Sequence, residues 1–543
     1  MLENAMYDLL INNGTVIDGT GKTSLKADLA IEGDHIARIG QNLRPDEVCR
    51  VIDASGLIVA PGFIDMHSHS DLTLFALGGA ESALYQGVTT EVIGNCGFSC
   101  YPVHQKRLKM LETYLVGIGY DRSYRMPWQD FDGYASHLEK RGIGVNAVSL
   151  AGHGSIRIAV MGFDSREATL QEREEMARLL QIALDQGAFG MSSGLIYPPG
   201  INSPAGELEE LCAVAARAGG LYATHLRGDS LRAGPSLVES LDEALQVARV
   251  TGVSLQVSHV AAKWPNSGAA DTVVERMERA TQEGLRVGCD MHPYMAAMTP
   301  LVTLMPPWFF EGGTDDIMRR LSDPAQRMRL RRALEAAFGH SGWDEFCSRT
   351  ETILGDSSSP YNRKRFTELA RTHGKDASEV ILDVLSAQGE DLFQPVALHW
   401  VYSQEDTLKT FLWDQSMIGA DAVSTSVEAR KELLSLHPRA WGTFPAALKQ
   451  FAREGKHVTM EEMVRRMTSL PAAMLGLKDR GTLAEGMKAD IAIFDNEKFT
   501  YKCTYEEPRQ YAEGMNWVFV NGTQAIEKGR HTGLRAGKVL KKK

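Results

Sequence analysis

The segment APGFIDMHSH, residues 60–69, is the stretch that decides the fold class, because it is a short apolar run that ends on two histidines. His67 and His69 are two residues apart, so the alternation of a β-strand would point both imidazoles to the same side. Such a pair is suited to holding a metal ion, although an isolated pair is as often two polar residues on a loop. The ends of the other strands must therefore decide between the two interpretations.

Seven further apolar runs with strand character follow, and helix-patterned stretches such as residues 165–187 separate them. Eight such units in a middle region of about 360 residues are what a (β/α)₈ TIM barrel needs, so we predict an α/β fold of that type. The later runs are VTTEVIGNC (88–96), NAVSLAGHG (146–154), AFGMSSGL (188–195), LYATHLRG (221–228), SLQVSHVA (254–261), RVGCDMHPY (286–294) and SMIGADA (416–422).

The two ends of the chain have a different texture from the middle. Short alternating runs broken by Asn-Gly and Glu-Gly-Asp turns predict β-hairpins near both termini. We expect a small β-sandwich domain built from residues 1–58 plus 480–543, with the barrel in residues 59–479. The last two predicted barrel strands are too far apart for a simple loop, so the helix-rich segment 301–394 is expected to be an insertion or lid subdomain.

Composition narrows the class of partner. The 543 residues carry 58 Lys and Arg against 69 Asp and Glu, a net charge of −11, which does not favour binding to nucleic acid. No apolar run approaches the roughly 18 residues of a membrane span, and the N-terminus lacks the pattern of a signal peptide. We expect a cytoplasmic protein with a small-molecule substrate and no nucleic-acid or membrane partner. The sequence leaves its oligomeric state open.

Ligand-type residues recur at the ends of the predicted strands. His225 ends the fifth strand, His259 the sixth and Asp421 the eighth, in addition to His67 and His69 at the first. Because the carboxyl ends of barrel strands meet at one face, these five side chains are expected to converge there. The sequence therefore predicts a metal site at that face.

Cys96 ends the second predicted strand and is a sixth candidate ligand. A carboxylated lysine on the fourth strand bridges two metal ions in many barrels of this kind, but residues 188–200 contain no lysine. A thiolate is a strong zinc ligand, so we predict that Cys96 binds the metal, although a lone cysteine is often just a small buried apolar residue. The nearby Cys100 is expected to be structural. His153 and His292, at the ends of the third and seventh strands, are expected to support the site or to contact substrate.

These motifs resemble the metal-dependent amidohydrolase superfamily and, within it, the D-aminoacylases, which hydrolyse N-acyl-D-amino acids. The pieces that carry the resemblance to this branch are GNCGFS, SSGLIYPPG and HPRAWGTFP, and the resemblance extends over nearly the whole chain. It implies a tightly bound zinc ion, a weaker neighbouring metal site and a general base. The residues implied are Cys96, His225 and His259 for the tight site, His67 and His69 for the weaker site, and Asp421 as the base.

Some positions depart from the family pattern. Ala420 and Ala422 flank Asp421 where the family usually has Ser and Gly, and His292 replaces the first tyrosine of a Tyr-Pro-Tyr motif. A substrate carboxylate needs a cation or convergent donors. The candidates on loops after the fourth, sixth and seventh strands, or at a strand end, are Lys263, Tyr197, Tyr294, Thr299 and His292.

Two other functions compete with N-acyl-D-amino-acid hydrolysis. A cyclic-amide hydrolase of the hydantoinase or dihydroorotase kind shares the histidines and the aspartate, but the missing fourth-strand lysine argues against it. A catalytically inactive metal-binding barrel is the second alternative, and the retention of Asp421 with every ligand argues against that. A metal assay combined with hydrolysis of an N-acetyl-D-amino acid separates the three.

Overall fold

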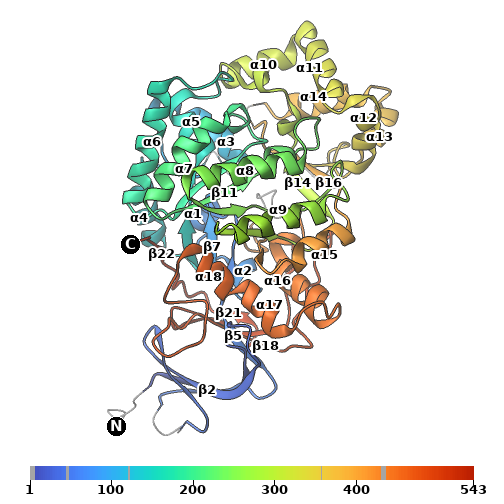
Figure 1. The fold of residues 1–543 in the computed structure, drawn as a ribbon. Coiled ribbons are helices and arrows are strands. Elements are labelled where there is room, and N and C mark those ends of the chain that lie inside the picture. The colour runs from blue at the N-terminus through green and yellow to red at the C-terminus, as the bar shows by residue number, and fades with distance from the viewer. Residues whose placement is uncertain are drawn as a thin grey trace.

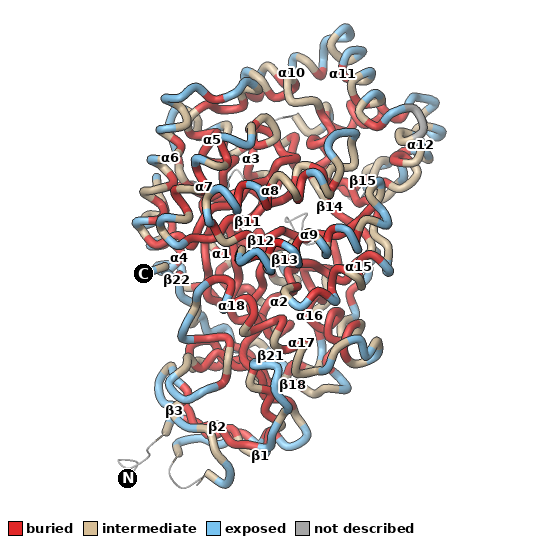
Figure 2. Tube along the Cα trace, in the orientation of Figure 1, coloured by how far each residue is buried: buried red, intermediate tan, exposed pale blue. Residues whose placement is uncertain are grey.

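The computed structural model describes residues 7–43, 48–119, 121, 123–355, 358–389, 391–429 and 436–543. Figure 1 shows a central α/β body, a strand-rich part that holds the N-terminal segment at one end, and a helical part at the other end. Buried residues run through the strands of the central body, as Figure 2 shows. No helix within the described ranges is long and apolar enough to cross a membrane.

Each of the eight segments predicted as a barrel strand contains a strand. All their mutual pairings are parallel, and the strands are buried almost throughout, as expected where helices cover a parallel sheet. The strands are β6 (Phe63–Asp65), β7 (Val88–Ile93), β8 (Asn146–Ser149) with its continuation β9 (Ala151–Gly152), β10 (Gly190–Gly194), β11 (Leu221–His225), β12 (Ser254–Val257), β13 (Val287–Met291) and β17 (Ser416–Ile418).

The last of these strands returns to the first. The backbone N–H of Met66 donates to the carbonyl oxygen of Ile418 at 3.3 Å, and Ser68 forms a parallel bridge with Ala422. Four long helices follow successive strands, and two of them begin with a capping box, at Thr169 and at Ser236. The helices are α6 (Leu170–Asp185), α7 (Ala205–Arg217), α8 (Leu237–Thr251) and α9 (Ala270–Gln282).

A nine-stranded sheet combines residues from both ends of the chain. Its two halves meet where β5 pairs antiparallel with β18, and the Asn521-Gly522 turn, in which both residues have positive φ, joins β19 to β20. The strands are β1 (Leu9–Val16), β2 (Leu25–Glu32), β3 (His35–Gly40), β4 (Val51–Asp53), β5 (Ile58–Pro61), β18 (Ile491–Phe494), β19 (Met515–Val520), β20 (Thr523–Glu527) and β21 (Arg530–His531).

The C-terminal end of the chain leaves this sheet. β22 (Val539–Leu540) pairs in parallel with β8 of the central body, opposite Ala147 and Val148. A two-residue strand has no periodicity that sequence reasoning can use, so this pairing did not follow from the sequence. The contact extends the sheet that contains β6, β7 and β8.

Between β13 and β17 the chain forms helices together with a small sheet. The sequence did not predict the antiparallel sheet β14 (Ala296–Pro300), β16 (Val396–Trp400) and β15 (Thr350–Ile353). The helices lie at the upper right of Figure 1. They are α10 (Thr314–Ser322), α11 (Pro324–Ala336), α12 (Gly339–Arg349), α13 (Phe366–His373) and α14 (Ala377–Ala387).

Candidate metal centre and active site

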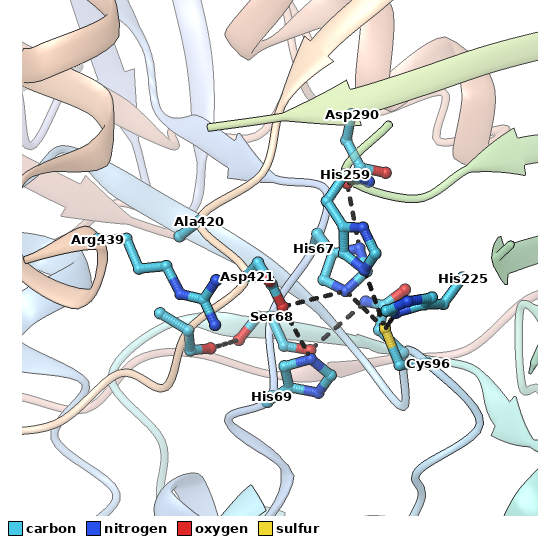
Figure 3. A network of polar contacts seen from close by, with 12 residues as sticks. His67, Ser68, His69, Cys96, His225, His259, Asp290, Ala420, Asp421 and Arg439 are labelled. Carbon is cyan, nitrogen blue, oxygen red and sulfur yellow. Dashed lines mark hydrogen bonds and ion pairs between the residues drawn. The ribbon is translucent and has the colours of Figure 1, made fainter. Parts of the chain in front are cut away.

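The predicted ligands gather at one end of the parallel strands, as Figure 3 shows. The sulfur of Cys96, just after β7, lies 3.3 Å from Nε2 of His67, 3.4 Å from Nε2 of His259 and 3.7 Å from Nδ1 of His225. All four side chains are buried. Three imidazole nitrogens and one sulfur around one point form a donor set that suits zinc.

The chemistry of Cys96 supports a cation at this point. Burial raises the pKa of its thiol to about 11, although the neighbouring His67 acts in the opposite direction. A thiolate, the form that binds metals, therefore needs a positive charge beside it to exist at neutral pH. The donors present thus fit a metal ion.

A second group of ligand atoms adjoins the first. Oδ1 of Asp421 lies 3.1 Å from Nε2 of His69 and 3.6 Å from Nε2 of His67. His67 thus contacts both groups, and its Nε2 lies between Cys96 and Asp421. Among the described residues, three sets of ligand atoms lie close enough together to hold an ion: His67 with Cys96 and His259, His67 with His69 and Asp421, and His225 with Asp229 and His259.

Three residues of the centre have strained backbone conformations. Cys96, His259 and Asp421 have φ values of 52°, 34° and 50°, in the left-handed region that costs non-glycine residues about 1–3 kcal/mol each. Hydrogen bonds hold two of them in place, from the N–H of Asp421 to the carbonyl oxygen of His67 at 2.7 Å and from the N–H of His259 to Asp290 at 2.8 Å. The fold therefore fixes the ligands before any ion binds.

Two carboxylates that sequence reasoning missed contact the far sides of the histidine rings. Oδ1 of Asp290 lies 3.1 Å from Nδ1 of His67, and Oδ2 of Asp229 lies 3.3 Å from Nε2 of His225 and 3.5 Å from Nδ1 of His259. A carboxylate in this place fixes the tautomer and the orientation of a metal-binding imidazole. Two features of the sequence could have identified these carboxylates. Asp290 lies on β13, one position from the strand end, and Asp229 follows His225 by four residues.

We expect Asp229→Asn to weaken zinc binding by about 10- to 100-fold, the effect of removing a carboxylate that orients metal ligands. The substitution replaces an acceptor shared by two histidines with an amide and leaves Lys263 without its partner. Competition with a chromogenic chelator measures the affinity. Asp242→Asn, an exposed aspartate on α8, is the matched control. Unchanged zinc affinity in the Asp229 variant would show that this carboxylate does not orient the ligands.

Lys263, predicted to meet a substrate carboxylate, already has a partner. Its Nζ lies 2.8 Å from Oδ2 of Asp229, and both side chains are buried. Lys263 lines a cavity of about 30 Å³ together with His225 and Thr299, and Oγ1 of Thr299 lies 3.2 Å from Nε2 of His399. The structure thus brings Lys263 and Thr299 next to the metal centre.

The three other predicted substrate contacts are buried. Tyr197 packs its ring edgewise against His225, with ring centroids 5.1 Å apart. His292 and Tyr294 do not line that cavity, and the hydroxyl of Tyr294 donates to the carbonyl oxygen of Pro438 at 3.3 Å. The ring of His292 packs against Tyr402, and its Nε2 has no hydrogen-bond partner among the described residues. His153 lies outside both ligand groups, where its Nε2 is 2.7 Å from Glu207.

Arg439 is a further site residue that sequence reasoning did not assign. Its Nη1 lies 2.7 Å from Oδ2 of Asp421, and its side chain is buried. Burial raises the pKa of Asp421, but Arg439 and His69 more than offset this effect and hold the pKa well below its usual range. Asp421 is therefore ionised at neutral pH. The arginine stands in HPRAWGTFP, so the motif was visible in the sequence while its role was not.

A buried metal-ligand cluster at the carboxyl ends of parallel strands, with an ionised aspartate at its edge, defines the class of metal-dependent hydrolase barrels. An amidohydrolase family model matches residues 50–303 and 377–524. The chain belongs to the amidohydrolase family and, within it, to the D-aminoacylases. The chain is 32% identical to a D-aminoacylase from Alcaligenes xylosoxydans xylosoxydans over 536 residues. This match covers 98% of this chain and 97% of the relative.

Solved structures agree with this assignment. A D-aminoacylase described as having a binuclear metal centre matches with a TM-score of 0.80 and 30% identity, covering 98% of this chain and all of that one. An N-acyl-D-glutamate deacylase from Bordetella bronchiseptica, complexed with zinc and a phosphonate inhibitor, matches with a TM-score of 0.79 and 28% identity over 98% and 99% of the two chains. An L-hydantoinase from Arthrobacter aurescens, at 17% identity and a TM-score of 0.53, shares the fold.

Proposed function

We propose that this protein hydrolyses the amide bond of N-acyl-D-amino acids in a zinc-dependent reaction. The observation that carries the proposal is the convergence of Cys96 and three histidines beside the ionised Asp421. The names of its full-length relatives, D-aminoacylase and N-acyl-D-glutamate deacylase, indicate the substrate class. The products would be a carboxylate and a D-amino acid.

The same proposal covers the organisation of the chain. It consists of a (β/α)₈ barrel in residues 59–479, a small β-sandwich domain from residues 1–58 plus 480–543, and an insertion over residues 301–394. The return of β17 to β6 and the sheet shared by both termini support this division. The barrel places every candidate ligand at one face.

We assign the tightly bound zinc to Cys96, His225 and His259, and a weaker site to His67 and His69. The distances of 3.4 and 3.7 Å from the sulfur to His259 and His225 support the first assignment. When bound, zinc supplies a Lewis acid that polarises the scissile carbonyl and activates water for attack. Because the Nε2 of His67 faces Cys96 as well as Asp421, this histidine adjoins both ion positions.

Asp421 acts as the general base and then as the general acid. Its Oδ1 faces the ligand cluster, so it accepts the proton of the attacking water and passes it to the leaving amine. His69 and Arg439 hold the carboxylate from two sides, at 3.1 and 2.7 Å. The low pKa that they impose keeps the aspartate ready to accept a proton.

The α-carboxylate of the substrate binds next to the metal centre. Lys263 is linked to the ligand histidines by its ion pair with Asp229. Thr299 lines the same cavity as His225, and Tyr197 packs against the ring of His225. Tyr294 and His292 contact each other just after β13, outside the lining of that cavity. A buried carboxylate needs such partners because an unpaired charge in a desolvated site is costly.

A paired substrate screen tests the function. We expect the zinc-loaded enzyme to hydrolyse N-acetyl-D-amino acids at least about 10²-fold faster, in kcat/KM, than their L-enantiomers, since a mirror-image substrate cannot present its carboxylate and its amide to the same partners. Release of the free amino acid measures the rate. Faster hydrolysis of hydantoin or dihydroorotate would identify a cyclic-amide hydrolase. Bound zinc with no hydrolysis of any of these substrates would identify an inactive barrel.

A further inference from the structure

The cavity beside the metal centre adjoins a second cavity further out. The inner one, about 30 Å³, is lined by His225, Asp229 and Lys263 at the end that meets the ligands. The outer one, about 320 Å³, lies between the loop that precedes α8 and the inserted helix α11. The walls that the two cavities share are Ile196, Ser230, Arg232 and Leu304.

Arg232 brings a positive charge to this shared wall. Its Nη1 donates to the carbonyl oxygens of Met305 at 3.1 Å and Leu304 at 3.5 Å, which leaves the other N–H groups of the guanidinium without a protein acceptor among the described residues. Burial lowers the pKa of Arg232, but a guanidinium stays protonated at any physiological pH. A partly buried cation therefore borders both cavities.

The neighbouring cations differ from Arg232 in having carboxylate partners. Lys263 is paired with Asp229, and Arg439 is paired with Asp421. Within the described ranges no carboxylate lies within ion-pair distance of Arg232. The inner cavity thus holds one more positive charge than its acidic residues balance. An anion that enters the cavity would be attracted by this charge, and a planar carboxylate matches the fork of a guanidinium.

The position of Arg232 indicates which anion this is. Lys263 is linked to the candidate metal ligands through Asp229. In the proposed function it therefore lies close to the scissile amide and the α-carboxylate of the substrate. Arg232 instead lies where the inner cavity meets the outer one, which Ala333 and Ala337 of the insertion also line.

Resting on the function proposed above, we infer that Arg232 selects substrates with a second carboxylate on the branch that enters the cavity. That carboxylate can belong to the amino-acid side chain, as in N-acetyl-D-glutamate, or to the acyl group, as in N-succinyl-D-alanine. In both cases the guanidinium binds it through its free N–H groups. Arg232 is then a specificity-determining residue that takes no part in the bond cleavage.

Matched substrates and variants test this inference. Wild-type enzyme is compared with Arg232→Met and Arg232→Lys, and with Arg319→Met, a largely exposed arginine of the insertion, as control. N-acetyl-D-glutamate is paired with neutral N-acetyl-D-glutamine, and N-succinyl-D-alanine with N-butyryl-D-alanine. Calorimetric binding of the same compounds to the zinc-loaded protein is a second readout that does not need turnover.

We expect wild-type kcat/KM to be at least about 10-fold higher for the acidic member of one pair, and that pair identifies the branch. Arg232→Met should lose about 10- to 100-fold on the acidic member and less than about 3-fold on the neutral one. Arg232→Lys should keep part of the preference, because it retains the charge but not the fork, and Arg319→Met should behave as wild type.

Two results would overturn the inference. The first is a wild-type enzyme that binds and hydrolyses the acidic and neutral members of both pairs alike. The second is an equal loss on both members in Arg232→Met, which would assign Arg232 to the α-carboxylate or to tethering the loop to Leu304 and Met305. Absence of hydrolysis with every substrate would refute the proposed function instead. The binding preference for the acidic members, and its loss in Arg232→Met, would still decide the inference.

Discussion

Replacement of Asp421 by asparagine is expected to lower kcat by about 10²- to 10⁴-fold while the fold and the tightly bound zinc remain, the scale for loss of a general base. The amide keeps the size of the side chain, and its one oxygen can still accept from Arg439 while its NH2 group faces His69. It cannot take a proton from water at neutral pH. The expected signature is therefore loss of turnover with little loss of stability.

The measurements for this variant are steady-state kinetics, zinc content by elemental analysis and the melting temperature. Asp490→Asn is the matched control, because Asp490 is also a buried aspartate paired with an arginine, Arg480, but lies outside the ligand cluster. The control should lose stability while its kcat stays near the wild-type value. Near-normal turnover in Asp421→Asn would remove Asp421 from the mechanism, and an unfolded variant would indicate a structural aspartate.

Replacement of Cys96 by alanine is expected to weaken binding of the tight zinc ion by about 10²-fold or more, because one ligand of a site usually worth 10–16 kcal/mol is lost. The sulfur is the atom around which the imidazole nitrogens of His67, His225 and His259 gather, at 3.3 to 3.7 Å. Activity should fall with zinc occupancy. Excess zinc should restore only part of it, since the thiolate also fixes the position of the ion.

Cys100→Ala is the matched control for this prediction. Cys100 is buried to the same degree four residues further on, but it belongs to neither group of ligand atoms. Elemental analysis and chelator competition should show full zinc in Cys100→Ala and depleted zinc in Cys96→Ala. Full zinc and full activity in the Cys96 variant would refute the ligand assignment.

The clustering of the candidate metal ligands could be predicted because these residues lie at strand ends. His67, Cys96, His225, His259 and Asp421 each end or follow an apolar run, and parallel strands bring such ends together whatever lies between them. The family and the α/β class were predictable for the same reason. The hairpin turn at Asn521-Gly522 also followed from local chemistry.

The partners of these residues could not be predicted in the same way. Asp229 contacts two histidines from different strands. Asp421 and Arg439 are 18 residues apart in the sequence but form an ion pair. Lys263 was predicted as a substrate contact, and its ion pair with Asp229 was not foreseen. An ion pair depends on distances of a few ångströms across the fold, and strand periodicity carries no such information.

The candidate metal ligands could be named from the sequence alone, because the alternation and the ends of strands are local properties that depend on hydrophobicity and chain geometry. Only the tertiary structure decided which charges are paired. It neutralises Lys263 with Asp229, ties Asp421 to Arg439, and leaves Arg232 without a described carboxylate partner between two cavities. Charge pairing is decided by three-dimensional proximity in a desolvated interior, where a shift of a few ångströms separates a paired from an unpaired ion.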